Sequence, residues 1–177
     1  MLLVLAHPDF SKSLANKEIV EKLKKLIPNI EIDDLYKLYP NFKIDVKKEQ
    51  EKLKKADTII LQFPMFWYNA PSLMRKWFED VLEHGFAYGA KGKELEGKKL
   101  IVSMTMGSPD EVYKDKLSCE NLSTGFSALA DLCKLKYVGV FHTGGVMYTI
   151  KEQPDVLKKK MEQLGKHAEK VAEAAKK

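Results

Sequence analysis

An apolar run, Thr58-Ile59-Ile60-Leu61-Gln62-Phe63, leads directly into the loop Pro64-Met65-Phe66-Trp67-Tyr68-Asn69-Ala70-Pro71. A short run rich in aliphatic residues predicts a strand buried on both faces, as in a parallel sheet. The residues that follow, 71–83, carry apolar side chains at helical spacing and charged side chains on the opposite face. A buried strand, a loop and an amphipathic helix in succession are typical of a parallel sheet covered by helices.

Four more β-prone runs alternate with helical patterns along the chain. The expected strands are 1–6, 30–35, 100–104 and 137–141, and the other expected helices are 13–27, 47–55, 118–133 and 154–175. Glu31, Asp33 and Asp34 interrupt the second of these strands, which is the pattern of an edge strand. We therefore predict an α/β fold, a doubly wound five-stranded parallel sheet of order 2-1-3-4-5 with helices on both faces. This order places a ligand crevice at the carboxyl ends of the first and third strands.

The loop after the first expected strand has the composition of an anion-binding site. Ser13 and Asn16 are good helix-start residues, and His7 adds an imidazole. The unpaired backbone N–H groups at such a helix end bind phosphate well. The alternative interpretation is a simple helix cap with a histidine in a turn.

The loops after the third and fourth strands suit a flat ligand. Residues 64–71 include three aromatic residues and two prolines, so they form a stiff apolar wall against which a conjugated ring can pack. Packing on the next helix or at a dimer contact would explain the same residues. Thr105-Met106-Gly107-Ser108 offers hydroxyls and a glycine that permits close backbone approach, or is merely a turn. Because all three loops meet at the predicted crevice, we favour a ligand site.

Two further segments are ambiguous from the residues alone. His84-Gly85-Phe86-Ala87-Tyr88-Gly89 brings a phenol near the crevice or is a glycine-capped connection, and His142-Thr143-Gly144-Gly145 follows the fifth strand as a turn. The four histidines lack metal-ligand spacing, so no metal site is expected.

Length, charge and cysteine content restrict the class of protein. The 177 residues suit one domain, 1–177, and no apolar run is long enough for a membrane span or signal peptide. The net charge of +5 comes from lysines scattered over helix faces, so nucleic-acid binding is not expected. Cys119 and Cys133 lie on one expected helix, too far apart to pair with each other. Reduced thiols point to the cytoplasm.

These motifs together resemble the flavodoxin-like NAD(P)H:quinone oxidoreductase family over essentially the whole chain. The residues that carry the resemblance are His7-Pro8 with Ser13 and Asn16, Gln62–Tyr68, Lys76-Trp77-Phe78, His84–Gly89 and the Thr105 loop. The chain is most similar to the short bacterial members, which include general stress quinone reductases and the ancillary flavoprotein of glutathione-gated potassium efflux.

The resemblance implies roles for individual residues. His7, Ser13, Leu14, Ala15 and Asn16 would hold the flavin phosphate. The residues along the isoalloxazine would be Pro64, Met65, Phe66, Trp67, Thr105, Met106, Gly107 and Ser108. Tyr88 and Tyr113 would be the catalytic phenols that contact the substrate or the hydride donor. Mammalian-type members carry a histidine after the second tyrosine, where this chain has Leu117, Ser118 and Cys119, and Ser108 replaces a usual glycine.

The resemblance also implies an activity. We expect a cytoplasmic homodimeric flavoenzyme that moves hydride from NAD(P)H through FMN to a quinone-like aromatic acceptor. FAD is an alternative to FMN, and the choice of NADH or NADPH and of quinone, azo dye or nitroaromatic stays open. The alternative role is a regulatory ancillary subunit of a potassium-efflux system, bound to a membrane transporter, with secondary reductase activity.

Three other protein classes share part of the pattern. A zinc deacetylase begins much like Ala6-His7-Pro8-Asp9, but it needs a second aspartate where Phe10 stands. A phosphoacceptor receiver domain needs an aspartate after the third strand, where Pro64 and Met65 lie. One-electron carrier flavodoxins are generally acidic, whereas this chain is basic.

Overall fold

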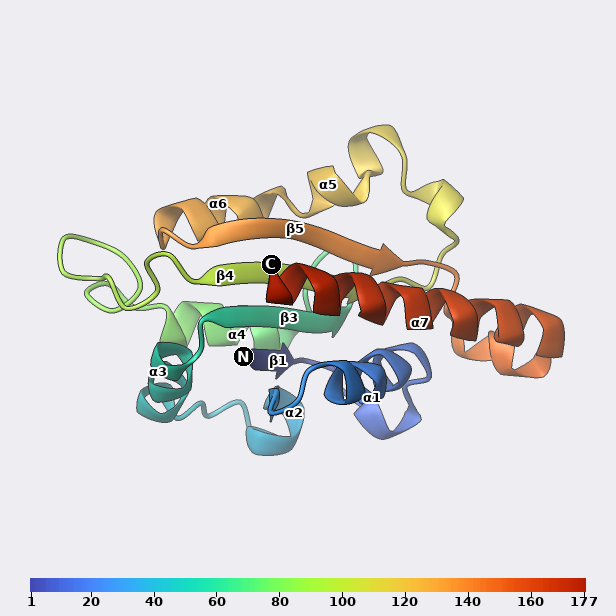
Figure 1. The fold of residues 1–177 in the computed structure, drawn as a ribbon, viewed down its shortest axis with the longest axis horizontal. Coiled ribbons are helices and arrows are strands. Elements are labelled where there is room, and N and C mark those ends of the chain that lie inside the picture. Colours follow the sequence, from blue (N-terminus) through green and yellow to red (C-terminus); the bar gives the residue numbers. More distant parts are fainter.

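A computed structural model describes residues 1–177, with the exception of the Tyr148 side chain. Its strands are β1 (Leu2–Leu5), β2 (Glu31–Asp34), β3 (Thr58–Pro64), β4 (Lys99–Thr105) and β5 (Lys136–Thr143). They form one parallel sheet in the order β2-β1-β3-β4-β5 (Figure 1). The predicted fold class and strand order are confirmed.

Four helices lie close to the predicted ranges 13–27, 47–55, 71–83 and 154–175, whereas a short helix at Leu35–Leu38 was not predicted and takes the last residue of the expected strand 30–35. The helices are α1 (Ala15–Leu26), α2 (Leu35–Leu38), α3 (Val46–Lys55), α4 (Ser72–Val81), α5 (Cys119–Leu122), α6 (Thr124–Leu132) and α7 (Pro154–Lys176). Short 3-10 helices occupy Phe10–Lys12, Asp110–Val112, Asp115–Leu117 and Tyr148–Glu152. Within the part of the chain that is described, no helix is long and apolar enough to cross a bilayer.

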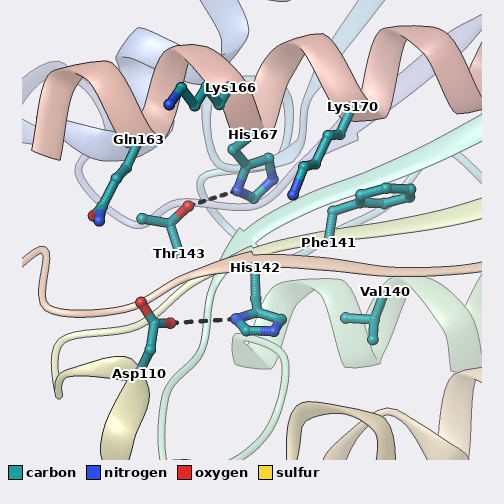
Figure 2. Close-up of a pocket in the computed structure, with 9 residues that line it drawn as sticks. All are labelled: Asp110, Val140, Phe141, His142, Thr143, Gln163, Lys166, His167 and Lys170. Carbon is teal, nitrogen blue, oxygen red and sulfur yellow. Dashed lines mark hydrogen bonds and ion pairs between the residues drawn. The ribbon is translucent and has the colours of Figure 1, made fainter.

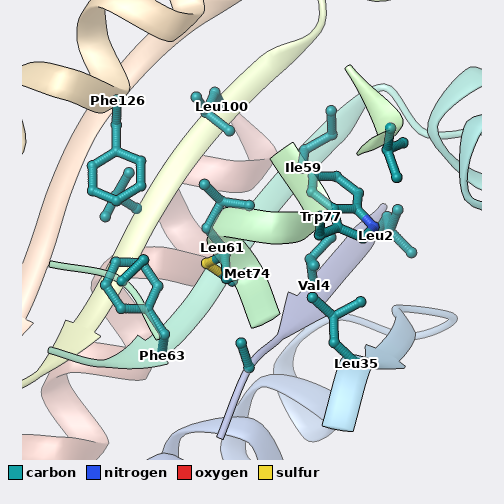
Figure 3. Close-up of a cluster of buried hydrophobic side chains, with 14 of the residues drawn as sticks. Leu2, Val4, Leu35, Ile59, Leu61, Phe63, Met74, Trp77, Leu100 and Phe126 are labelled. Carbon is teal, nitrogen blue, oxygen red and sulfur yellow. The ribbon is translucent and has the colours of Figure 1, made fainter. Parts of the chain in front are cut away.

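Two apolar cores cover the two faces of the sheet. Because successive side chains of a strand point to opposite faces, Leu3 and Leu5 of β1 pack with α1 and α7. Leu2 and Val4 face the other way, where Trp77 of α4 and Phe126 of α6 fill the second core (Figure 3). Covering both faces leaves the edges and the strand ends of this sheet for ligands.

The expected helix 118–133 is wrong as one helix, because the structure breaks it at Ser123. The Ser123 backbone has φ −94° and ψ 0°, and its hydroxyl donates to the Glu120 carbonyl at 2.9 Å. A serine side chain that bonds the preceding turn competes with helix continuation. The buried, free thiols of Cys119 and Cys133 therefore belong to different segments, α5 and the end of α6, rather than to one helix.

A buried charged cluster ties β2 to α3 and α4. The Lys52 ammonium donates to the carboxyl groups of both Asp33 and Glu49, and Glu49 also accepts hydrogen bonds from the Tyr39 hydroxyl at 2.6 Å and the Trp77 indole at 2.9 Å. Burial opposes the ionisation of Glu49, but its hydrogen bonds outweigh this and lower its pKa. Burial and the contact with Glu49 raise the pKa of Asp33. Asp33 is therefore the carboxyl that keeps a proton.

We predict that Asp33→Asn removes one component of the pH dependence of stability. The pKa of Asp33 is higher in the folded protein than in the unfolded chain, where it is about 4. Between these two pKa values the folded protein therefore holds one proton more than the unfolded chain. The wild type then loses about 1.4 kcal/mol per pH unit from this group, from about pH 4 up to the raised folded pKa. Urea unfolding at several pH values should show this loss relative to Asp33→Asn. The exposed Asp57→Asn is the control, and parallel curves for wild type and Asp33→Asn would contradict the prediction.

Candidate functional site

A cavity of about 320 Å³ opens where the loops after β1, β3 and β4 meet. It lies at the carboxyl ends of the strands, where the chain order 2-1-3-4-5 places a crevice. The residues that line it are His7, Asp9, Lys12, Ser13, Leu14, Ala15, Asn16, Pro64, Met65, Phe66, Thr105, Met106, Gly107, Val146, Met147 and Lys151. Every residue that the sequence suggested for cofactor binding is among them except Trp67 and Ser108.

Trp67 and Ser108 lie outside this cavity. The Trp67 side chain is 94% exposed at the tip of its loop, where Trp67 and Tyr68 have positive φ values of 50° and 62°. Ser108 is exposed, and its carbonyl accepts a hydrogen bond from the Gly145 amide at 2.7 Å. The aromatic loop therefore divides into two parts: Pro64, Met65 and Phe66 reach the cavity, and Trp67 faces away from the protein.

The two expected catalytic phenols also lie outside the cavity lining of their own chain. The ring of Tyr88 packs edge-on against His84, with 5.5 Å between ring centroids. Tyr113 follows the 3-10 helix Asp110–Val112 and packs against the apolar core beside α5 and α6. The structure thus gathers the binding loops predicted from the sequence, but it does not bring these phenols into the same cavity.

The start of α1 supplies an anion-binding end to the cavity. Leu14, at the N-cap position, makes no side-chain capping bond, and Ser13 instead accepts the Asn16 amide at 3.2 Å. Lys151 also lines the cavity, as does Lys12, which forms an ion pair at 2.7 Å with Asp9, another lining residue. The partial positive charge of a helix N-terminus and the ammonium group of Lys151 favour a negatively charged ligand.

His7 is a neutral donor at the edge of this site. Its Nδ1 accepts the Asp9 amide at 3.1 Å, so a neutral ring carries its hydrogen on Nε2. Burial lowers the pKa of His7, although the carboxylates of Asp9 and Asp34 act in the opposite direction. The imidazole therefore keeps one N–H group for a ligand.

A buried amide orients two hydroxyls of the cavity. Asn16 Nδ2 donates to Thr105 Oγ1 at 2.9 Å and to Ser13 Oγ at 3.3 Å, while Asn16 Oδ1 accepts from Gln62 Nε2 at 2.8 Å. Among the side chains that the structure describes, neither hydroxyl donates to a protein acceptor. Because both accept hydrogen bonds from the protein, their own hydrogens are free for an acceptor in the cavity.

Sequence reasoning missed five lining residues: Asp9, Lys12, Val146, Met147 and Lys151. The last three come after the expected turn His142–Gly145, in a stretch for which no role was predicted. Met147 closes the cavity next to Gly107, where an added Cβ would lie 3.2 Å from Met147 Cγ. A hydrophobic pair directly after the glycines Gly144-Gly145 was the available signal.

Two other hollows differ in chemistry. One of about 460 Å³ lies between β5 and α7 and is lined by His142, His167, Lys166 and Lys170 among others (Figure 2). The other, about 840 Å³, is a shallow groove between α1 and α7 with mainly lysine, glutamate and aliphatic side chains. Neither combines a helix N-terminus with convergent loops, so the smaller cavity is the better candidate. Within the described residues, no group of three or more His, Cys, Asp or Glu is placed to hold a metal ion.

Known proteins match this chain over most of its length. The family model for the flavodoxin-like fold matches residues 1–168. The uncharacterized NAD(P)H oxidoreductase YrkL of Bacillus subtilis is 35% identical over 155 residues, which are 85% of this chain and 88% of the relative. The glutathione-regulated potassium-efflux system ancillary protein KefF of Salmonella typhimurium is 41% identical over 143 residues, 80% of this chain and 81% of the relative.

Solved structures show the same architecture. General stress protein 14 of Treponema denticola, solved in complex with FMN, has a TM-score of 0.85 and 28% identity, and the match covers 98% of each chain. An NADPH-quinone reductase from P. pentosaceus has a TM-score of 0.76 and 25% identity over 94% of this chain and 96% of the other. The resemblance inferred from the sequence motifs is thereby confirmed, and the chain belongs to the flavodoxin-like family of NAD(P)H oxidoreductases and quinone reductases.

Proposed function

We propose that the protein binds FMN in the 320 Å³ cavity and catalyses hydride transfer from NAD(P)H to a quinone-like aromatic acceptor. The observation that carries this proposal is that one cavity combines three features: a helix N-terminus suited to an anion, two hydroxyls whose hydrogens are free for a ligand, and an apolar wall. Family membership supports the reaction class, and the FMN complex of the Treponema denticola relative supports FMN over FAD.

The polar end of the cavity fits a phosphate monoester. Ser13 and Thr105 offer hydroxyl hydrogens, His7 offers an N–H, and the first turn of α1 offers backbone amides. Lys151 adds a positive charge for a phosphate group, while the charge of Lys12 is shared with Asp9. Hydrogen-bond donors and a net positive charge select an acceptor-rich anion and disfavour a neutral ligand.

The apolar end of the cavity fits a flat conjugated ring. Pro64, Met65 and Phe66 form one wall, and Met106 with Gly107 forms another. The Met65 amide is held by the Thr105 carbonyl at 2.8 Å and the Phe66 amide by Asn69 at 2.9 Å, so the wall is preorganised. A fixed wall orients a bound ring without a large loss of chain entropy.

The residues of this chain position and shield the reactants. FMN held in this cavity would supply the redox chemistry, the transfer of hydride between NAD(P)H and the acceptor. The two apolar walls exclude water on the sides of the ring that they cover. We assign Tyr88 and Tyr113 to donate hydrogen bonds to the acceptor carbonyl, whose oxygen gains negative charge as it is reduced.

A second copy of the chain would complete this pocket. Phe66, Trp67 and Tyr68 are exposed at 45%, 94% and 51%, a concentration of aromatic surface that favours an interface. Because Tyr88 and Tyr113 lie outside the cavity of their own chain, a homodimer is the assembly in which phenols and cavity serve one site. We propose this cytoplasmic homodimer as the working form of a single domain, 1–177.

The first prediction concerns the phosphate end. Purified protein should be yellow, its released chromophore should have the mass of FMN, and Ser13→Ala should weaken FMN binding about tenfold, because one charge-assisted hydrogen bond is lost. Fluorescence titration of the flavin-free protein measures this change. Ser11→Ala, an exposed serine of the same loop, is the control, and riboflavin, which has no phosphate, should bind both variants alike. A colourless protein that takes up neither FMN nor FAD would refute the proposal.

The second prediction concerns Tyr88. Tyr88→Phe should lower kcat for a soluble benzoquinone about tenfold, because the developing oxyanion loses one hydrogen-bond donor. FMN affinity should not change, since the Tyr88 hydroxyl is assigned to the acceptor and Tyr88 does not line the cavity of its own chain. Tyr36→Phe removes a hydroxyl that lies 3.4 Å from Ser72 and serves as the control. Unchanged quinone turnover would remove Tyr88 from the mechanism.

A second role is favoured by the 41% identity to KefF, whose name states that it is ancillary to a potassium-efflux system. In this role the protein would bind a membrane transporter and regulate potassium efflux, with the reductase activity secondary. Co-purification with the efflux transporter of its own organism and an increased efflux rate on co-expression should then be observed. An efflux rate that does not respond to the protein would leave the free enzyme as the function.

A further inference from the structure

A continuous chain of buried hydrogen bonds starts beneath the cavity and crosses the α1/α7 face of the sheet. It runs from Asn16 to Gln62 at 2.8 Å, from Gln62 to Ser103 at 2.6 Å, and from Ser103 to His167 at 2.8 Å. It ends at Thr143, whose Oγ1 is 2.9 Å from His167 Nδ1. These five residues are at most 4% exposed. Figure 2 shows the imidazole pointing from α7 toward the sheet, with Thr143 as its partner.

His167 is neutral in this environment. Burial lowers its pKa to about 3, and the nearby His142 and Lys170 act in the same direction. A neutral imidazole has one N–H donor and one acceptor nitrogen. Both nitrogens have partners here, so the position of the single hydrogen decides which partner must donate and which must accept.

The chain has two possible directions, and each fixes every hydrogen in it. In the first direction, which the amide orientation of Gln62 defines, Ser103 donates to Gln62 Oε1, so His167 Nε2–H donates to Ser103 and Thr143 donates to Nδ1. Gln62 Nε2 then donates to Asn16, which donates to Thr105 and Ser13. In the reverse direction both amides turn over, and the hydrogen of His167 lies on Nδ1.

The direction changes what the cavity offers to a ligand. In the first direction the hydroxyls of Ser13 and Thr105 accept from Asn16, so their own hydrogens are free for the cavity. In the reverse direction the Asn16 side-chain oxygen accepts hydrogen bonds from both hydroxyls. The cavity then loses two donors, and the exposed oxygen lone pairs repel an anion. A mixed direction leaves a buried group without its partner, which costs more than either complete chain.

We propose that His167 is a positioning residue whose Nε2–H tautomer holds the chain in the direction that makes Ser13 and Thr105 donors to the ligand. The residue acts through Ser103, Gln62 and Asn16 and does not touch the ligand. The inference rests on the proposed function only for the identity of the ligand, a phosphate ester such as FMN. The tautomer itself is a property of the protein alone.

The direct test is the tautomer of His167 in the unmodified protein. Long-range 1H–15N spectra of 15N-histidine-labelled protein at pH 7 should show a protonated Nε2 and an unprotonated Nδ1, with and without FMN. His167→Leu identifies the signals among the four histidines. A hydrogen on Nδ1, or on both nitrogens, overturns the proposal. If the wild type shows the Nε2–H tautomer but binds no flavin, the proposed function fails and this assignment stands.

Two variants test the consequence for the ligand. His167→Leu should weaken FMN binding about fivefold and riboflavin binding by no more than about twofold, because both chain directions become accessible and only the phosphate ester depends strongly on the donors. His167→Gln should restore most of the FMN affinity, since an amide again donates to Ser103. His142→Leu removes a histidine from the same hollow but outside the chain, and should change neither affinity. Equal losses for the Leu and Gln variants, or for FMN and riboflavin, overturn the proposal.

Discussion

The burial of both faces of β1, β3 and β4 constrains everything else in this protein. Leu3, Leu5 and Ile60 must be covered from one side and Leu2, Val4 and Leu61 from the other, which requires helices in two layers. The chain leaves the carboxyl end of each strand toward a helix. Because the strands are parallel, the loops that make these connections lie together at one edge of the sheet. The cavity is therefore a consequence of how the sheet is covered, and the loops only determine which ligand it accepts.

Polar side chains inside an otherwise apolar layer link the fold to the site. Gln62 and Ser103 are neighbours across β3 and β4, and Thr105 pairs with Thr143 across β4 and β5. A buried polar side chain without a hydrogen-bond partner lowers the stability of the fold. These side chains must therefore satisfy one another's hydrogen bonds. The resulting hydrogen-bond network connects the C-terminal ends of β3, β4 and β5 to α1 and α7. Stability and ligand preference consequently depend on the same few atoms.

The sequence predicted the architecture well because hydrophobic periodicity determines it. The order of the strands followed from the charged residues Glu31 and Asp34 in one strand and the apolar runs elsewhere. Pairings between side chains far apart in the chain were out of reach: Asn16 and Thr105 are 89 residues apart, and Ser103 and His167 are 64 apart. Gln62 and Ser103 in buried strands were nevertheless a visible sign of such a network. The break at Ser123 was missed because an apolar pattern continues across it.

The two outer strands have a further consequence for the behaviour of the protein in solution. An open sheet edge exposes unpaired backbone groups that invite another strand to add. β2 has only four residues, three of them acidic, and β5 carries an irregularity opposite Leu100 and Ile101 with Gly139 at φ 136°. Edge strands that are short, charged or interrupted by a bulge are poor templates for the addition of another strand. Pairing of copies through the two sheet edges is therefore disfavoured, and the loop and helix surfaces are left for any contact between copies.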